Sequence, residues 1–92
     1  MLHLIIYDVV NDARRSKVHS ALKDFGVKVQ FSAFEARLHP RERTLLLRRV
    51  APLIDPLVDR FAIYPITQEQ ESRIACVGMP RPEHRRAAFM VV

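Results

Sequence analysis

Cysteine and glycine are scarce in this chain of 92 residues, which has only Cys76, Gly26 and Gly78 of these two types. A single cysteine excludes an internal disulfide framework and fits a reducing compartment, and we expect Cys76 to be a small buried hydrophobic residue. Neither glycine belongs to a glycine-rich loop of the kind that cradles phosphates. The common classes of nucleotide-binding enzyme are therefore excluded.

Long apolar runs are also missing. No run approaches the roughly 20 residues that a membrane-spanning helix needs. The apolar segment 2–7 has no basic region before it and is followed at once by Asp8, which is not the pattern of a signal peptide. We therefore expect a cytoplasmic protein that makes no membrane contact.

Positive charge, by contrast, is plentiful. Lys and Arg number 15 against 10 Asp and Glu, which gives a net charge of +5. This balance favours polyanionic partners through long-range attraction, although it also serves solubility alone. Hydrophobic residues make up 49% of the chain, which indicates one small globular domain whose core gains from oligomerisation. A homodimer is therefore expected.

Hydrophobic periodicity divides the chain into strands and helices. The predicted elements are a central strand over 2–10, a helix over 11–25, a strand over 27–38, a helix over 40–55, a strand over 58–66, a polar connection over 67–72 and a strand over 73–78. Gly26 supplies a stop signal for the first helix, and Pro40 suits the first turn of the second. The near-continuous apolar character of 2–10 predicts a strand covered on both faces.

Taken as written, this order is β-α-β-α-β-β. Splitting the 27–38 run into two short strands, or relocating one strand, gives the β-α-β-β-α-β order of the ferredoxin-like fold. In that α+β fold two helices pack on one face of an antiparallel sheet. We expect a core domain over 1–78 and a C-terminal arm over 79–92.

The end of the C-terminal arm is apolar and strand-like, which suits pairing with a second chain. It consists of Phe89, Met90, Val91 and Val92. These residues are the predicted dimer contact.

Asp8 is the one acid in an otherwise apolar strand, where an ionised carboxylate is costly unless it is compensated. One explanation is structural, namely an ion pair with Arg14 or Arg15, or contact with a nearby helix N-terminus. The other is functional. Mg²⁺ or another divalent cation is commonly held by one or two carboxylates with waters and substrate phosphates, and a twofold axis would supply a second Asp8. The residues alone leave both explanations open.

Arg14, Arg15 and Lys17 lie near Asp8 in the sequence, in the first turns of the predicted helix. Their cationic groups suit phosphate oxygens, although they equally suit a solvated helix start.

Three aromatic residues stand at strand spacing. Tyr7, Phe31 and Phe34 have rings that can stack on bases, but the spacing favours the core for all three.

An ordered set of short motifs resembles the CRISPR-associated protein two family over about residues 2–80. The specific part is a strand ending in Tyr7-Asp8, an Asp-x-Arg-Arg-x-Lys helix start over 12–17, and a Gln-x-Ser-x-Phe-Glu strand over 30–35. Further matching residues are Leu22, Gly26, Val29, Asp59, Ile63, Tyr64 and Gly78. The chain departs from the family at Lys28, where many members have Arg, and at Ala33 and Ala36, which replace Val and Cys.

The resemblance implies a ferredoxin-like fold, a tight homodimer and a C-terminal strand that pads the partner's sheet. It implies one long strand over 27–38 that leads into the second helix, and closing strands that complete the sheet with the partner. It also assigns the site residues. Asp8 is then the catalytic, metal-binding acid, Arg14, Arg15, Lys17 and Lys28 bind nucleic acid, and Tyr7 and Phe34 support the site.

Three functions follow as hypotheses. The first is a CRISPR adaptation protein that binds duplex DNA as a homodimer with the CRISPR integrase, CRISPR-associated protein one, and that is a metal-dependent endonuclease on RNA or duplex DNA. The second is a stand-alone toxin-type endoribonuclease of the same fold. The third is a plain ferredoxin-like interaction module, which would stay functional after substitutions that neutralise its charges. No convincing general base is visible.

Overall fold

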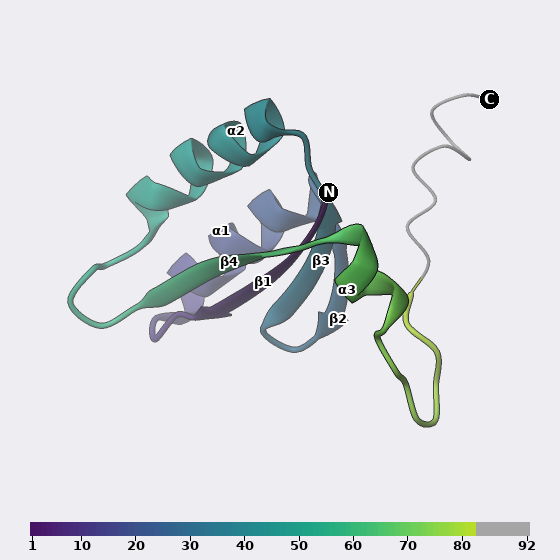
Figure 1. The fold of residues 1–92 in the computed structure, drawn as a ribbon. Helices are drawn as coiled ribbons and strands as arrows, with labels where there is room; N and C mark the ends of the chain where they lie inside the picture. Colours follow the sequence, from purple (N-terminus) through teal and green to yellow (C-terminus); the bar gives the residue numbers. More distant parts are fainter. Residues whose placement is uncertain (83–92) are drawn as a thin grey trace.

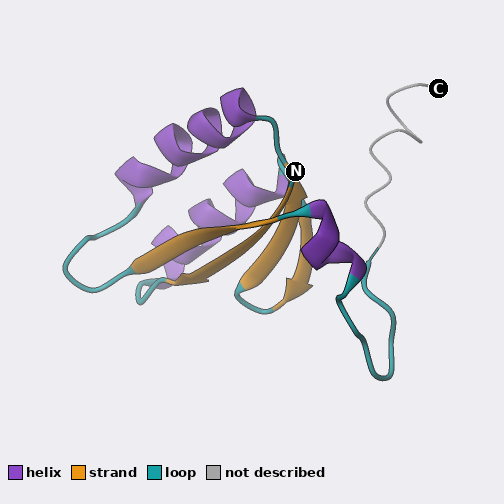
Figure 2. Ribbon diagram, viewed as in Figure 1, coloured by secondary structure: helices purple, strands orange, loops and turns teal. Residues whose placement is uncertain are grey.

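Four strands form one antiparallel sheet in the computed structural model, which describes residues 1–82 (Figure 1). The elements are β1 (Leu2–Asp8), α1 (Asp12–Lys23), β2 (Val27–Gln30), β3 (Ala33–Arg37), α2 (Pro40–Val50), the 3-10 helix η1 (Ala51–Leu53), β4 (Arg60–Ile66) and α3 (Gln68–Ser72). The strand order is β2-β3-β1-β4, and α1 and α2 lie on one side of the sheet (Figure 2). The order β-α-β-β-α-β confirms the predicted α+β, ferredoxin-like fold.

The first strand, β1, is central, as predicted, and pairs with β3 on one side and β4 on the other. Within the single chain the predicted cover is present on one face only. Ile5 and Tyr7 are buried against the helices, whereas Ile6 is 42% exposed and Asp8 is exposed on the opposite face. Because successive side chains in a strand point to opposite faces, this alternation separates Asp8 from the core.

The segment predicted as one strand over 27–38 is a hairpin of β2 and β3, with a register irregularity between Lys28 and Gln30. Its turn, Phe31-Ser32, contains no Gly, Pro, Asn or Asp, so Ser32 is its one weak turn signal. Contacts with β1 hold the turn instead. The Tyr7 amide donates to the Ser32 carbonyl at 3.1 Å, and the Tyr7 hydroxyl donates to the Phe31 carbonyl at 3.4 Å.

Local capping explains where the two long helices begin. The Asn11 side chain accepts a hydrogen bond from the Arg14 amide at 2.9 Å, which caps α1. Pro40 stands at the first position of α2, and the Glu42 carboxylate accepts from the His39 amide at 2.8 Å. Both helices then bury apolar side chains against the sheet. The core consists of Ile5, Tyr7, Val9, Val18, Ala21, Leu22, Phe34, Ala36, Leu38, Leu46 and Val50.

The segment after β4 corrects two predictions. The polar connection over 67–72 contains the short helix α3, which a capping box begins: Thr67 accepts from the Gln70 amide at 3.1 Å, and Gln70 accepts from the Thr67 amide at 2.9 Å. Among the described residues no strand forms over 73–78, and α3 is the last regular element after β4. Cys76 lies in this segment and is exposed rather than buried.

Two ion pairs join the segment after β4 to the sheet. Arg37 donates to Glu71 at 2.9 Å, and Arg81 donates to Glu35 at 2.6 Å. The predicted boundary at residue 78 stays a prediction, and the predicted dimer strand lies outside the described residues. In the described part of the chain, no helix is both long and apolar enough to cross a bilayer.

We expect Gly26→Ala to lower the free energy of unfolding by at least about 2 kcal/mol. A Cβ at Gly26 would overlap the backbone oxygen of Glu35 and lie 2.8 Å from Ala36 Cβ, so the connection between α1 and β2 would have to move away from β3. Gly78→Ala is the matched control. It meets open space and carries only the strain of a positive φ, a cost of about 1 kcal/mol. Urea titration measures both, and equal losses for the two variants would contradict the packing explanation.

Candidate active site and nucleic-acid interface

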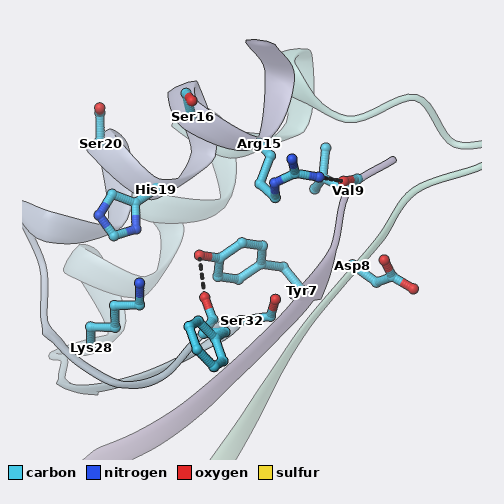
Figure 3. A pocket seen from close by; sticks show the side chains of 10 residues that line it. Tyr7, Asp8, Val9, Arg15, Ser16, His19, Ser20, Lys28 and Ser32 are labelled. Atoms are coloured by element: carbon cyan, nitrogen blue, oxygen red, sulfur yellow. Dashed lines mark hydrogen bonds between the residues drawn. The ribbon is translucent and has the colours of Figure 1, made fainter. Parts of the chain in front are cut away.

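Asp8 ends β1 on the face of the sheet opposite the helices. In Figure 3 its carboxylate points away from Tyr7, His19 and Lys28. Its cross-strand neighbour on β4 is Arg60, so a cation and a carboxylate share this face at the end of two strands. The sequence hypothesis that Arg14 or Arg15 compensates Asp8 is not what the structure shows, because both arginines bind other carboxylates.

Arg14 binds Asp59, a residue that follows the loop after η1. The Arg14 Nε and Nη2 atoms donate to the two carboxylate oxygens at 2.9 and 3.1 Å. The same oxygens accept from the backbone amides of Val10 and Asp55, each at 2.9 Å. The Asp59 side chain is 0% exposed, and the Arg14 guanidinium holds the pKa of this carboxyl far below its usual range. This cluster fastens the chain just after Asp8 to the chain just before β4.

Sequence reasoning gave Asp59 no role, although Asp59 stood among the residues that carried the family resemblance. No local pattern reveals it, because its four donors come from Val10, Arg14 and Asp55, two of which are 45 or more positions away along the chain. The predicted role of Arg14 in nucleic-acid binding stays a prediction, with its guanidinium bound bidentately to Asp59.

The other predicted cations point to different places. Arg15 donates to the Val9 carbonyl at 2.9 Å and forms an ion pair with Asp12. Lys17 is exposed on another side of α1, in a hollow shared with Arg49. Lys28 is exposed on β2. Of the four predicted nucleic-acid ligands, the structure therefore brings only Arg15 and Lys28 to one hollow.

That hollow has a volume of about 620 Å³ and lies between β1, α1 and the β2–β3 hairpin (Figure 3). It is lined by Tyr7, Asp8, Val9, Arg15, Ser16, His19, Ser20, Lys28, Phe31 and Ser32. We call it the hairpin hollow. Cationic and hydroxyl-bearing side chains from three elements meet there, which suits an anionic ligand.

Of the three aromatic residues, two belong to the core as predicted. The rings of Tyr7 and Phe34 lie 6.3 Å apart and both side chains are buried, and burial raises the pKa of the Tyr7 hydroxyl. The expectation for Phe31 was wrong. Its ring is 88% exposed at the hairpin turn. Tyr7 and Phe34 can support the site by holding β1 against β3 and the hairpin, and neither ring is accessible to a base.

Asp8 offers one exposed carboxylate to a divalent cation. No cluster of three or more His, Cys, Asp or Glu side chains suited to a metal occurs within residues 1–82. One carboxylate with waters and substrate phosphates is an accepted magnesium arrangement. The Asp8 carboxylate is exposed and thus accessible to such a ligand set.

The fold and this site define a class, namely a small basic ferredoxin-like protein with one exposed carboxylate at the end of its central strand. The sequence profile of the family described as CRISPR associated protein Cas2 matches residues 1–74. The chain belongs to this family.

Individual relatives agree over most of their length. The chain is 39% identical to "CRISPR-associated endoribonuclease Cas2 3" of Chloroflexus aurantiacus, over 86% of this chain and 85% of that one. It is also 39% identical to "CRISPR-associated endonuclease Cas2 2" of Thermus thermophilus, over 97% and 96%. Among solved structures, Cas2 of Streptococcus pyogenes at pH 6.5 has a TM-score of 0.71 and 29% identity, over 85% of this chain and all of that one. A hypothetical protein of Thermus thermophilus has a TM-score of 0.78 and 36% identity, over 89% and 96%.

Proposed function

We propose that this protein is a metal-dependent endonuclease of CRISPR adaptation, which binds duplex DNA as a homodimer beside the CRISPR integrase and cleaves RNA or duplex DNA. The observation that carries the proposal is the exposed Asp8 carboxylate at the end of β1, in a chain that belongs to the Cas2 family. Relatives of this chain are named as endoribonucleases and as an endonuclease, which supports a phosphodiester substrate.

Asp8 has the role of holding the divalent cation in this proposal. When bound, the cation supplies Lewis-acid polarisation of the phosphodiester and a more acidic water. The residues of the chain bind and orient the substrate. Lys17 and Lys28 are exposed and attract phosphates, and Arg15 has a partly exposed guanidinium beside the strand end. Asp59 keeps the end of β1 in place through the Val10 amide.

The test is a cleavage and binding assay with RNA and with duplex DNA, each with Mg²⁺ and with a chelator. We expect cleavage only with Mg²⁺, and we expect the affinity for duplex DNA to fall by roughly tenfold or more between 50 and 200 mM salt, because phosphate contacts release counterions. Cleavage of single-stranded RNA without any affinity for duplex DNA would favour the second candidate, a stand-alone toxin-type endoribonuclease. Binding that is independent of salt would contradict both candidates.

The proposed homodimer follows from the uncovered face of the sheet. Ile6 and Tyr64 are 42% and 51% exposed there, on neighbouring strands, although both are large and apolar or aromatic. A second copy of the chain would cover them and would bring a second Asp8 to the same face. The C-terminal residues Phe89–Val92 are proposed to add a strand to the partner.

Deletion of residues 89–92 is expected to weaken the dimer by at least about tenfold in Kd, because an apolar strand is lost from the contact. Light scattering and sedimentation over a range of micromolar concentrations measure the change. Replacement of the same four residues by Ser is the length-matched control and should weaken the dimer as the deletion does. An intact chain that is monomeric in this range would contradict the proposal.

A further inference from the structure

The hairpin hollow adjoins Asp8 but is formed mainly by other residues. Its lining comes from β1, from the side of α1 that bears Arg15 and His19, and from the β2–β3 hairpin. Asp8 stands on its rim and is the only acid among the lining residues, and its carboxylate points away from the other side chains (Figure 3). The hollow is therefore a cationic site on the helix side of the sheet.

The cations of the hollow come from two different elements. Arg15 lies on α1 and Lys28 on β2, and the hydroxyl groups of Ser16, Ser20 and Ser32 stand among them. This combination of charged donors and hydroxyl donors is the chemistry that binds phosphate oxygens.

Arg15 is available to a phosphate even though it has an acidic partner. That partner, Asp12, has a side chain that is 92% exposed, and ion pairs between exposed side chains contribute little to stability. The bond from Arg15 Nη1 to the Val9 carbonyl at 2.9 Å holds the guanidinium at the end of β1. A phosphate can thus replace Asp12 without displacing the anchored part of the side chain.

The pKa of His19 depends on the positive charges near the hollow. Its ring packs edge-on against Phe34 with centroids 5.4 Å apart. Burial lowers the pKa of His19, and the positive charges of Lys28 and Lys23 lower it further. A bound anion would oppose those charges and favour the imidazolium, so it would raise the pKa of His19.

Phe31 gives the hollow an exposed aromatic rim. Its ring is 88% exposed, and the Lys28 ammonium lies 5.8 Å from the ring centroid. The hydrogen bond from the Tyr7 hydroxyl to the Phe31 carbonyl fixes the turn that presents the ring. An exposed ring beside cations is the combination on which unpaired bases stack.

We propose that the hairpin hollow binds one unpaired nucleotide, with its phosphate between Arg15 and Lys28 and its base against Phe31. The volume of about 620 Å³ lies within the range of roughly 300–1,000 Å³ that is usual for small-molecule sites. A base inside a duplex has both faces covered by its neighbours, whereas an unpaired or extruded base can offer a face to Phe31. This inference rests on the proposed function. It adds an unpaired nucleotide of the substrate to the duplex backbone that the chain is proposed to bind.

The test uses a 5′-phosphorylated trinucleotide with 2-aminopurine as its first base, made as DNA and as RNA and added to the full chain. Phe31→Ala is expected to lower its affinity at least about fivefold, because one base stack is lost. Leu57→Ala, at a side chain that is 90% exposed in the loop after η1, is the matched control and leaves the affinity unchanged. Lys28→Gln also lowers it, whereas Arg48→Gln, at an exposed cation on α2, does not.

Two further readouts separate this inference from other outcomes. The NMR titration of His19 should shift to higher pH when the trinucleotide is saturating, and an unmoved titration overturns the inference. The inference is also overturned if Phe31→Ala leaves the trinucleotide affinity unchanged. If that variant weakens self-association instead, Phe31 is a contact between protein chains. If the wild-type chain binds and cleaves duplex DNA but does not bind the trinucleotide, this inference alone is refuted. If the wild-type chain shows no duplex binding, no cleavage and no trinucleotide binding, the proposed function is refuted.

Discussion

Asp8→Asn is expected to lower the rate of Mg²⁺-dependent cleavage by roughly 100-fold or more, because a neutral amide attracts the cation much more weakly than a carboxylate does. The change keeps the shape of the side chain. Asp8 is exposed and lies outside the core, so folding should be unchanged. Duplex binding by the basic side chains and dimer formation should persist as well. Single-turnover cleavage, with gel-shift and light-scattering measurements on the same preparation, checks all of these.

Asp24→Asn is the matched control for Asp8→Asn. Asp24 follows the far end of α1, is also exposed, and bonds Arg49 at 2.7 Å. Removing the charge of Asp24 should leave the cleavage rate unchanged. Cleavage at the wild-type rate in Asp8→Asn would show that another site or a contaminant is responsible, and loss of the dimer would show that Asp8 is structural.

Asp59→Asn is expected to lower Tm by roughly 10 °C. The four donors to Asp59 all point N–H groups at its carboxylate oxygens. An amide turns one of those oxygens into a donor, so at least one bond becomes a contact between two donors. Thermal unfolding followed by circular dichroism measures the loss, and Asp24→Asn, an exposed acid of the same type, should show almost none.

The same carboxylate predicts how stability depends on pH. The pKa of Asp59 is lowered in the folded state, so its contribution is complete at neutral pH and is lost as pH falls below the usual Asp range near 4. Stability of the wild type should thus decline below about pH 4, and Asp59→Asn should lack this part of the decline. Parallel acid unfolding curves for the two proteins would contradict a buried, charged Asp59.

Part of the site was accessible to sequence reasoning because it depends on short-range order. The apolar run that ends in Tyr7-Asp8 predicted a central strand with an acid at its end, and that is where β1 places Asp8. Asn11 and Pro40 marked the starts of the two long helices, since capping acts within one turn. Tyr7 and Phe34 were predicted as core residues from their spacing, and both are buried.

What the sequence by itself determined was the α+β class, the two helices, the central strand and the excess of positive charge, all of which depend on local periodicity, capping or composition. The tertiary structure decided the rest. The Phe31-Ser32 turn depends on bonds to Tyr7, the Arg14 guanidinium is held by Asp59 rather than Asp8, and β4 rather than 73–78 completes the sheet. Each of these depends on groups far apart in the chain, and pairings at that distance leave no periodic trace in the sequence around either partner.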